Sequence, residues 1–387
     1  MKIKWTILGC LLLIQSSIVF AGFTTGTFKY KGAWRKYAIY VPAIYASSSE
    51  KVPLLLGLHG YGDDIDNFRN ICMTNIADTA NYICVYAEAL PWLGANAWNS
   101  GAGVGIINVN SEVDDVGFLN SLIDTVISKY RIDTTRMYAF GFSFGGFMVD
   151  RLATECSQRF AAACNVSGLH GNFLAGKIPS TYVPYLKFHG TNDPTISYNG
   201  MQTVGLFPGF GLSAENTVKF WMTQNHCDTI PIVDSMPNTA NDGLRFIRFT
   251  YNNDYNNSKV IFYKVLNGLH KWYGLPANDI SYCQTIWDFF RQYKRENFVT
   301  AIRNINHVEQ IKIFPNPSNG NFTVSLQNLN YNIQQISIFD IAGKEVYTQA
   351  VTTQSPITIV SNLPKGLYLL RLVDNEKHAM TEKIIIE

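Results

Sequence analysis

The segment Gly141–Gly145 reads Gly-Phe-Ser-Phe-Gly and matches the pattern G-x-S-x-G, in which a serine stands at a sharp turn between a strand and a helix. An apolar run that ends at Phe140 precedes it, and a helical pattern from Phe144 to Ala153 follows it. Small residues let the chain turn sharply there, and the positive end of the following helix points toward the hydroxyl group. We therefore predict that Ser143 is a nucleophile. The alternative is a glycine-rich turn that only connects a strand to a helix.

A serine hydroxyl is a weak nucleophile at neutral pH, so it needs a histidine base and a carboxylate that orients the histidine. On a strand–turn–helix scaffold of this kind, the carboxylate and then the histidine follow the serine along the chain. Asp193 comes directly after an apolar run, and His270 lies between the last apolar run and the last helical pattern. We predict the triad Ser143, Asp193 and His270. Weaker candidates are Asp150, Asp228, Asp242, Asp254, His170, His189, His226, His307 and His378.

An attack on a carbonyl group produces an anionic oxygen that needs backbone N–H donors. We predict one donor at Phe144, directly after the serine, and the other in the glycine-containing loop Leu58–Asp64, with Tyr61 preferred and Gly60 as the second choice. Aromatic residues near these segments either contact the substrate or pack in the core, and the predicted substrate contacts are Trp98, Tyr198 and Trp272. The sequence has no cysteine or histidine spacing typical of a metal site, and this chemistry needs no cofactor.

Apolar runs alternate with helical patterns through most of the chain, which predicts an α/β fold with a mostly parallel sheet covered by helices on both faces. A hairpin is expected over residues 26–44. The runs expected as buried strands begin at Val52, Tyr82, Arg136, Phe160, Tyr185 and Lys259. The expected helices lie within residues 113–130, 144–153, 214–222 and 279–293. A Gly-rich stretch around Phe207–Leu212 looks like an insertion, and the sequence does not indicate its role.

The chain has 387 residues, a net charge of +2 and a charged fraction of 16%, which gives no indication of a nucleic-acid partner. Residues 1–21 have lysines at positions 2 and 4, continue as a short apolar run and end in a small residue, so they are predicted to be a cleaved signal peptide. We predict a catalytic domain over 22–298, a linker over 299–309 and a β-sandwich over 310–387, where short β-rich runs replace the helical patterns.

Removal of the signal peptide would leave six cysteines, which allow 15 disulfide pairings in an exported protein. The sequence does not choose among them. Cys72 with Cys84 and Cys156 with Cys164 are the pairs that need the least loop closure, and buried free thiols are the alternative.

The region of about residues 24–295 resembles the polyhydroxybutyrate depolymerases and the secreted feruloyl and acetylxylan esterases of carbohydrate esterase family one. The motifs that carry the resemblance are His59–Gly62, Asp114–Leu119, Gly141–Gly146, His189–Asp193 and Gly268–Trp272. The resemblance implies an α/β-hydrolase fold and the triad named above. Phe144 is larger than the residue often found after the serine, and Leu269 stands where the family has a second glycine.

The tail resembles a type IX secretion (Por) type A sorting domain. The motifs are Ile313–Pro317, Asp340–Lys344, Leu363–Tyr368 and Lys383–Glu387. This resemblance implies export across the outer membrane, an extracellular or cell-surface location and a partner in the secretion machinery. No segment after residue 21 is long and apolar enough to predict a membrane span. A carbohydrate-binding sandwich is the alternative for this segment.

These observations predict a secreted serine esterase that acts through an acyl-enzyme on polysaccharide-linked feruloyl or acetyl esters or on polyesters. Two alternatives stay open. One is a peptidase of related fold, because the sequence does not show how His270 would protonate an amine leaving group. The other is a non-catalytic glycan-binding surface protein built on a hydrolase scaffold.

Overall fold

The computed structural model describes residues 21–104, 107–200, 210–253, 257–295, 311–326, 333–340, 344–351, 356–374 and 379–387. The chain divides into two compact units, Met1–Asn297 and Phe298–Glu387, and each is described by itself. The expected signal peptide, except its last residue, and the expected linker lie outside the described residues, as do Phe207, Asp254, His307 and His378.

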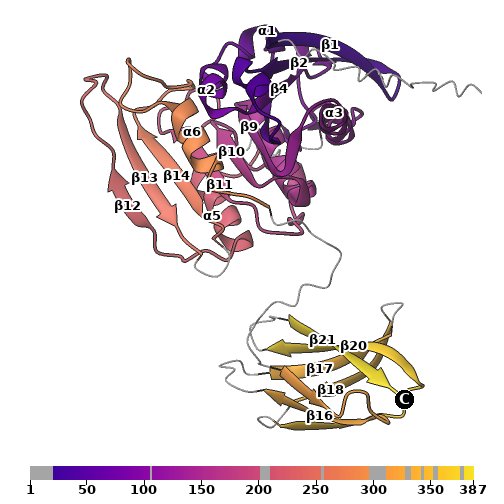
Figure 1. The fold of residues 1–387 in the computed structure, drawn as a ribbon. Coiled ribbons are helices and arrows are strands. Elements are labelled where there is room, and N and C mark those ends of the chain that lie inside the picture. Colours follow the sequence, from indigo (N-terminus) through magenta and orange to yellow (C-terminus); the bar gives the residue numbers. More distant parts are fainter. Residues whose placement is uncertain are drawn as a thin grey trace, which may run out of the picture. The chain divides into compact units, whose positions relative to one another are not determined.

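A ten-stranded sheet forms the centre of the first unit, in the order β1-β2-β4-β3-β9-β10-β11-β14-β13-β12 (Figure 1). The strands from β4 to β14 in this order run parallel, while β1-β2 and β13-β12 add antiparallel pairs at the two edges. The mostly parallel sheet predicted from the sequence is therefore confirmed. The strands are β1 Gly22–Tyr30, β2 Ala33–Val41, β3 Val52–Leu58, β4 Ile83–Ala87, β9 Ile132–Phe142, β10 Ala162–Val166, β11 Tyr185–Gly190, β12 Ile232–Ser235, β13 Arg245–Tyr251 and β14 Val260–Leu266.

Helices cover both faces of this sheet, so each face packs in its own core. One core contains apolar residues of α3 (Asp115–Lys129), α4 (Phe144–Glu155) and α5 (Ala214–Gln224). The other core contains residues of α1, α2 and α6. Every residue of β3, β4, β10 and β11 is buried, as expected for parallel strands covered on both faces. The remaining elements are α1 Ile65–Phe68, α2 Met73–Ala80, α6 Tyr282–Phe290, η1 Ala43–Ser47, η2 Ser157–Arg159, η3 Asn172–Leu174 and the short strands β5 Pro91–Trp92, β6 Ala95–Asn96, β7 Gly103–Val104 and β8 Ile107–Asn108.

The second unit is all-β. It contains a three-stranded sheet, β15-β16-β19, and a four-stranded sheet, β18-β17-β20-β21. Inward-facing residues of both sheets form one apolar core, which includes Val324, Ile338, Ile359 and Leu370. The strands are β15 Ile311–Phe314, β16 Asn321–Leu326, β17 Ile333–Phe339, β18 Glu345–Ala350, β19 Ile357–Val360, β20 Gly366–Asp374 and β21 Ala379–Ile386.

One disulfide joins Cys72, at the start of α2, to Cys283 in the first turn of α6. The prediction of disulfide bonding is confirmed, but neither of the two short-loop pairs forms. Cys84 lies inside β4 and Cys164 inside β10, and both are buried free thiols, as is Cys156. The pairing follows from the packing of α2 beside α6 rather than from the length of the loop that is closed.

Within the described ranges, no helix has the length and apolar content that a membrane crossing requires.

Candidate active site

Ser143 lies in the turn between β9 and α4 with a left-handed backbone, φ 56° and ψ −121°. A non-glycine residue pays a conformational cost in this region, of order 1–3 kcal/mol, so surrounding bonds must hold it there. The Ser143 N–H donates to the Val166 carbonyl at 2.8 Å, and the Gly146 N–H donates to the Ser143 carbonyl at 2.9 Å. The neighbouring strand β10 and the first turn of α4 therefore fix the turn from both sides.

Two glycines make this turn possible. A β-carbon at Gly141 would collide with the Gly145 carbonyl, and one at Gly145 would collide with the carbonyls of Leu58 and His59. Chain segments therefore cross here at backbone contact distance. The glycines that the sequence pattern picked out are required by this close approach.

The Ser143 hydroxyl is not used to cap its helix. Ser143 is the N-cap residue of α4, yet its side chain accepts no capping hydrogen bond. The N-cap side chains of α1, α3, α5 and α6 all accept one from a backbone N–H; these residues are Asp64, Asp114, Ser213 and Ser281. The hydroxyl of Ser143 is thus available for other partners, although the residue is only 7% exposed.

Asp193 and His270, which are 77 residues apart in the sequence, form a hydrogen bond. His270 Nδ1 lies 2.7 Å from Asp193 Oδ2. Asp193 follows the end of β11 and His270 follows the end of β14, and these two strands are parallel neighbours. The carboxyl ends of both strands meet at one edge of the sheet, which brings the two side chains together.

The Asp193 carboxylate is buried and well supplied with donors. Its Oδ1 accepts the N–H groups of Thr195 and Ile196 at 2.9 and 2.8 Å. Burial acts to raise the pKa of Asp193, but the bonds from His270 and Ile196 outweigh it and hold the pKa below its usual value. The carboxylate therefore stays ionised at neutral pH and accepts the Nδ1–H of His270. This bond leaves Nε2 of the ring without a proton in the neutral tautomer.

The His270 ring lies beside the residue that precedes the serine. Its centroid is 4.7 Å from the centroid of Phe142, and its side chain is 14% exposed. Among the described residues, no hydrogen bond joins the Ser143 hydroxyl to this ring. The structure thus brings Asp193 and His270 into direct contact and places His270 against the strand end that leads into Ser143.

The loop after β3, which contains Gly60 and Tyr61, also lies next to Ser143. A β-carbon built on Gly60 would be 3.7 Å from Ser143 Oγ, so the backbone of this loop runs past the hydroxyl. The ring of Tyr61 packs edge-on against Phe144 at 6.0 Å, and Tyr61 is 49% exposed. The predicted donor residues Tyr61 and Phe144 are therefore neighbours beside Ser143.

The three predicted substrate contacts all pack into the protein. Trp98 is fully buried, and its Nε1–H donates to the His59 carbonyl at 2.9 Å. Tyr198 is 8% exposed, and its hydroxyl donates to Glu215 at 2.8 Å. Trp272 is half-buried in a cluster of aromatic rings with Phe68, Phe140, Phe142 and Tyr282. The structure does not bring Trp98 or Tyr198 to the protein surface beside the serine.

A buried lysine lies near the Asp193 carboxylate, and the sequence patterns did not predict it. Lys187 of β11 is fully buried, donates to the Gly168 carbonyl, and lies 3.4 Å from His189 Nδ1. His189 Nε2 in turn is 2.8 Å from the Ile196 carbonyl. Burial, assisted by the charge of Lys187, lowers the pKa of His189 to about 3, so this ring is neutral and structural. A charged residue inside an otherwise apolar strand was the signal that could have identified it.

In the part of the chain that the structure describes, no cluster of three or more His, Cys, Asp or Glu side chains is arranged to hold a metal ion.

Two family models match the chain. Residues 40–207 match the family described as Phospholipase/Carboxylesterase, and residues 312–387 match the Secretion system C-terminal sorting domain. The first match contains Ser143 and Asp193, and the second covers the all-β unit from its first strand to its end.

Curated relatives carry esterase names. The putative esterase NocK of Nocardia uniformis is 27% identical over 63% of this chain and 72% of its own length. A bifunctional acetylxylan esterase/xylanase of Neocallimastix patriciarum is 26% identical over 71% of this chain, which corresponds to 36% of that protein. A probable feruloyl esterase C of Aspergillus niger is 25% identical over 66% of this chain and 83% of its own length.

Proposed function

We propose that Ser143, His270 and Asp193 carry out the reaction of this secreted or cell-surface carboxylesterase through an acyl-enzyme. The observation that carries the proposal is the 2.7 Å bond between Asp193 and His270, made beside the strand end that leads into Ser143. The other histidine near this carboxylate, His189, lies farther away, with its Nε2 3.8 Å from Asp193 Oδ2.

In the proposed reaction, His270 Nε2 takes the proton of the Ser143 hydroxyl as the oxygen attacks the ester carbonyl. The Asp193 carboxylate holds the ring by Nδ1–H and stabilises the imidazolium that forms. The proton then passes from Nε2 to the departing alcohol, and a water molecule, activated in the same way, releases the acid. Hydrogen bonds between nucleophile and base are often long without substrate and tighten when it binds, so the missing bond between Ser143 and His270 is compatible with these roles.

The negative oxygen of the tetrahedral intermediate would bind the backbone N–H groups of Phe144 and Tyr61. Phe144 begins α4, whose positive end favours negative charge at this place. Tyr61 comes from the loop that runs past Ser143. Among the described residues, no side chain or carbonyl accepts the Tyr61 N–H, so this donor is available.

For the substrate we propose a polysaccharide-linked feruloyl or acetyl ester, or a polyester. The names of the feruloyl and acetylxylan esterase relatives support the first two, and the family resemblance of the motifs supports the third. The all-β unit is proposed to address the enzyme to the secretion machinery, and the substrate would then be met outside the cell.

The test compares the full chain with Ser143→Ala. The parent enzyme should hydrolyse p-nitrophenyl acetate and react with a fluorophosphonate probe, while Ser143→Ala should lose roughly 10⁵-fold or more in kcat and all labelling. Release of ferulate from arabinoxylan, acetate from acetylxylan and hydroxybutyrate from poly-hydroxybutyrate then identifies the substrate. Turnover by Ser143→Ala at the parent rate would remove the proposed nucleophile.

A further inference from the structure

The loop that is proposed to supply the second oxyanion donor is held by the side chain of His59. This ring is fully buried and makes two hydrogen bonds, one from each nitrogen. The Ala89 N–H lies 3.1 Å from Nε2, and the Gly60 carbonyl oxygen lies 2.7 Å from Nδ1. The ring therefore connects the chain after β4 to the loop after β3.

These two bonds fix the tautomer of His59. A backbone N–H can only donate, so Nε2 must be the acceptor and carry no proton. The proton of the neutral ring is then on Nδ1, and it is donated to the Gly60 carbonyl. Burial lowers the pKa of His59, which keeps the ring neutral and both bonds in place near neutral pH.

The Gly60 carbonyl and the Tyr61 N–H belong to the same peptide group. Gly60–Tyr61 is not among the cis peptides of the described chain, so the group is trans and planar, and its C=O and N–H point in opposite directions. A side chain that holds the carbonyl oxygen on one side therefore sets the direction of the N–H on the other. The Asp63 N–H is a second, longer donor to the same oxygen, at 3.4 Å.

Trp98 holds the preceding peptide. Its buried Nε1–H donates to the His59 carbonyl at 2.9 Å, and its ring centroid is 5.2 Å from that of the His59 ring. Two successive carbonyls of the loop, those of His59 and Gly60, are thus each held by a buried aromatic N–H.

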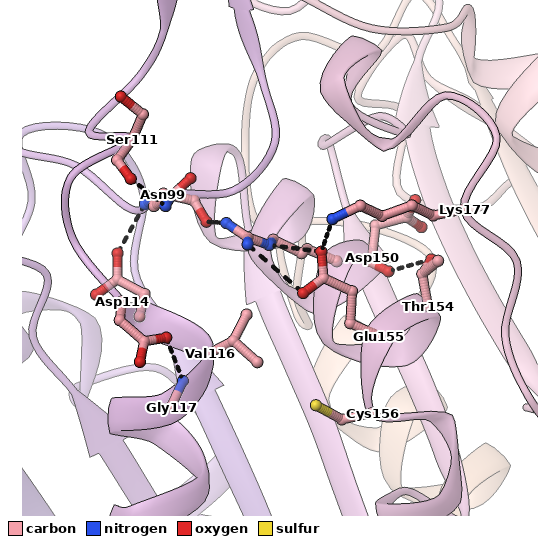
Figure 2. Close-up of polar contacts among 12 residues, drawn as sticks. Asn99, Ser111, Asp114, Val116, Gly117, Asp150, Thr154, Glu155, Cys156 and Lys177 are labelled. Carbon is pink, nitrogen blue, oxygen red and sulfur yellow. Dashed lines mark hydrogen bonds and ion pairs between the residues drawn. The ribbon is translucent and has the colours of Figure 1, made fainter.

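The buried ion pair between Arg35 and Asp115 fixes the backbone of Asn99, the residue that follows Trp98. Asp115 is paired with Arg35 at 2.6 Å, and its other oxygen accepts the Asn99 N–H at 2.7 Å. Arg151 donates to the Asn99 carbonyl, and the Asn99 side chain donates to the carbonyls of Ser111 and Val113. Figure 2 shows Asn99 with its bond to Ser111, and the Glu155–Lys177 pair on the α4 side of the same network.

We propose that His59 is a positioning residue of this esterase, which aims the Tyr61 N–H at the oxyanion through the Gly60 carbonyl, with Trp98 as its support. This inference rests on the proposed function, because it assigns a role to the Tyr61 N–H in the same reaction. A positioning residue of this kind acts on the transition state, where the negative oxygen exists, and not on the bound ester.

The experiment measures kcat and KM for p-nitrophenyl acetate in His59→Leu and His59→Asn. Loss of one oxyanion donor costs roughly 10²–10³-fold in kcat, so a donor that is misdirected by His59→Leu should cost about 10²-fold with KM changed less than about twofold. His59→Asn keeps an N–H donor near the place of Nδ1 and should recover at least about tenfold of that loss.

Trp98→Phe and Trp221→Phe form a matched pair. Both tryptophans are fully buried, and each donates its Nε1–H in one hydrogen bond, Trp98 to the His59 carbonyl and Trp221 to Asp150 at 2.7 Å. Trp98→Phe should lower kcat about tenfold at unchanged KM, while Trp221→Phe should keep the parent kcat. The comparison of these two variants tests the proposed positioning of the loop even if the His59 variants do not fold.

Parent values of kcat in His59→Leu, or equal kcat in the two tryptophan variants, would overturn the inference and leave the triad untouched. A rise in KM that accounts for the whole loss would also overturn it, because a binding role would then explain the data. Activity that survives in Ser143→Ala would instead refute the proposed function, and the role of His59 with it.

Discussion

Among the described residues of the catalytic unit, two histidine–aspartate pairs are joined by a short hydrogen bond, and both bonds use the same kinds of atoms. His270 Nδ1 is 2.7 Å from Asp193 Oδ2, and His170 Nδ1 is 2.5 Å from Asp150 Oδ2. Their surroundings differ. The His270 ring lies against Phe142 at the end of β9. The His170 ring packs on Phe220 of α5, with 4.0 Å between the two ring centroids. A pair of this kind is therefore not by itself a sign of catalysis.

The carboxylates differ in what else they bind. Asp193 accepts two backbone N–H groups of its own loop, so only His270 uses its remaining oxygen at short distance. Asp150 lies inside α4 and accepts the Tyr185 hydroxyl and the Trp221 Nε1–H with its other oxygen. The second pair connects α4 to β11 and α5, which is a structural role. His170 and His270 each follow the end of a parallel strand, so the two pairs differ in the place of the carboxylate: Asp193 follows the end of β11, whereas Asp150 lies inside α4.

The largest effect is expected from the same substitution at both histidines. Asparagine keeps a donor to the carboxylate but lacks the second ring nitrogen, so it removes the base and spares the pairing. His270→Asn should lower kcat for p-nitrophenyl acetate by roughly 10⁵-fold, in the range measured for other triad histidines. His170→Asn should keep kcat within about twofold. Comparable losses at the two positions would contradict the division of roles.

The next largest effects are expected when each of the two carboxylates is replaced by an amide. Asp193→Asn should lower kcat about 10⁴-fold with little change in the free energy of unfolding, because the amide favours the wrong tautomer of His270. Asp150→Asn should keep kcat but lower the free energy of unfolding by about 3 kcal/mol. The buried donors of His170, Tyr185 and Trp221 would then face a neutral amide that cannot accept all three hydrogen bonds as the carboxylate does. Urea unfolding beside the kinetic assay measures both. An Asp150→Asn protein that is stable but inactive would contradict the structural role assigned to Asp150.

The last prediction concerns the buried Lys187, which interacts electrostatically with both carboxylates and affects stability rather than kcat. Burial lowers the pKa of Lys187 to about 7, although Asp150 of α4, Cys164 of β10 and Asp193 favour its charged form, and neutral His189 is its neighbour at 3.4 Å. An unfolded lysine has a pKa near 10.5. Between these values the unfolded chain binds the extra proton, so this residue makes the free energy of unfolding rise with pH.

Lys187→Met should remove that slope, which is at most about 1.4 kcal/mol per pH unit. The stability of the parent relative to Lys187→Met should therefore increase from pH 7 toward pH 10.5 and be level below pH 7. Urea unfolding at several pH values measures it, and Lys219→Met, at an exposed lysine of α5, controls for the loss of one positive charge. A pH-independent difference at Lys187 would show that the lysine stays charged when buried.

The sequence predicted much of this arrangement because parallel strands end at one edge of the sheet. Asp193 and His270 could be placed near each other from their positions after two apolar runs, and the structure has them in contact. The expected helix over residues 113–130 is α3, Asp115–Lys129, because its apolar stripe and the Asp114 cap are both local signals. Patterns of this kind depend only on residues close in sequence.

Other features depend on packing between distant segments and left no local pattern. Strands β12 and β13 were not predicted, because an edge pair with half-exposed residues lacks a continuous apolar run. Trp98 was expected among the substrate contacts because an indole ring suits a binding site as well as a core, and spacing does not give its direction. The partner of Cys72 was unpredictable for the same reason, since α2 and α6 meet only in the folded chain.

The bond between Cys72 and Cys283 closes a covalent ring over a sequence separation of 211, and Ser143, Asp193 and His270 all lie within it. A protease that nicks a surface loop inside this ring leaves two fragments that stay joined. They would migrate as one band on a non-reducing gel and separate only after reduction. The all-β unit begins beyond the ring, at Phe298, so after a cut between the two units this disulfide does not join them.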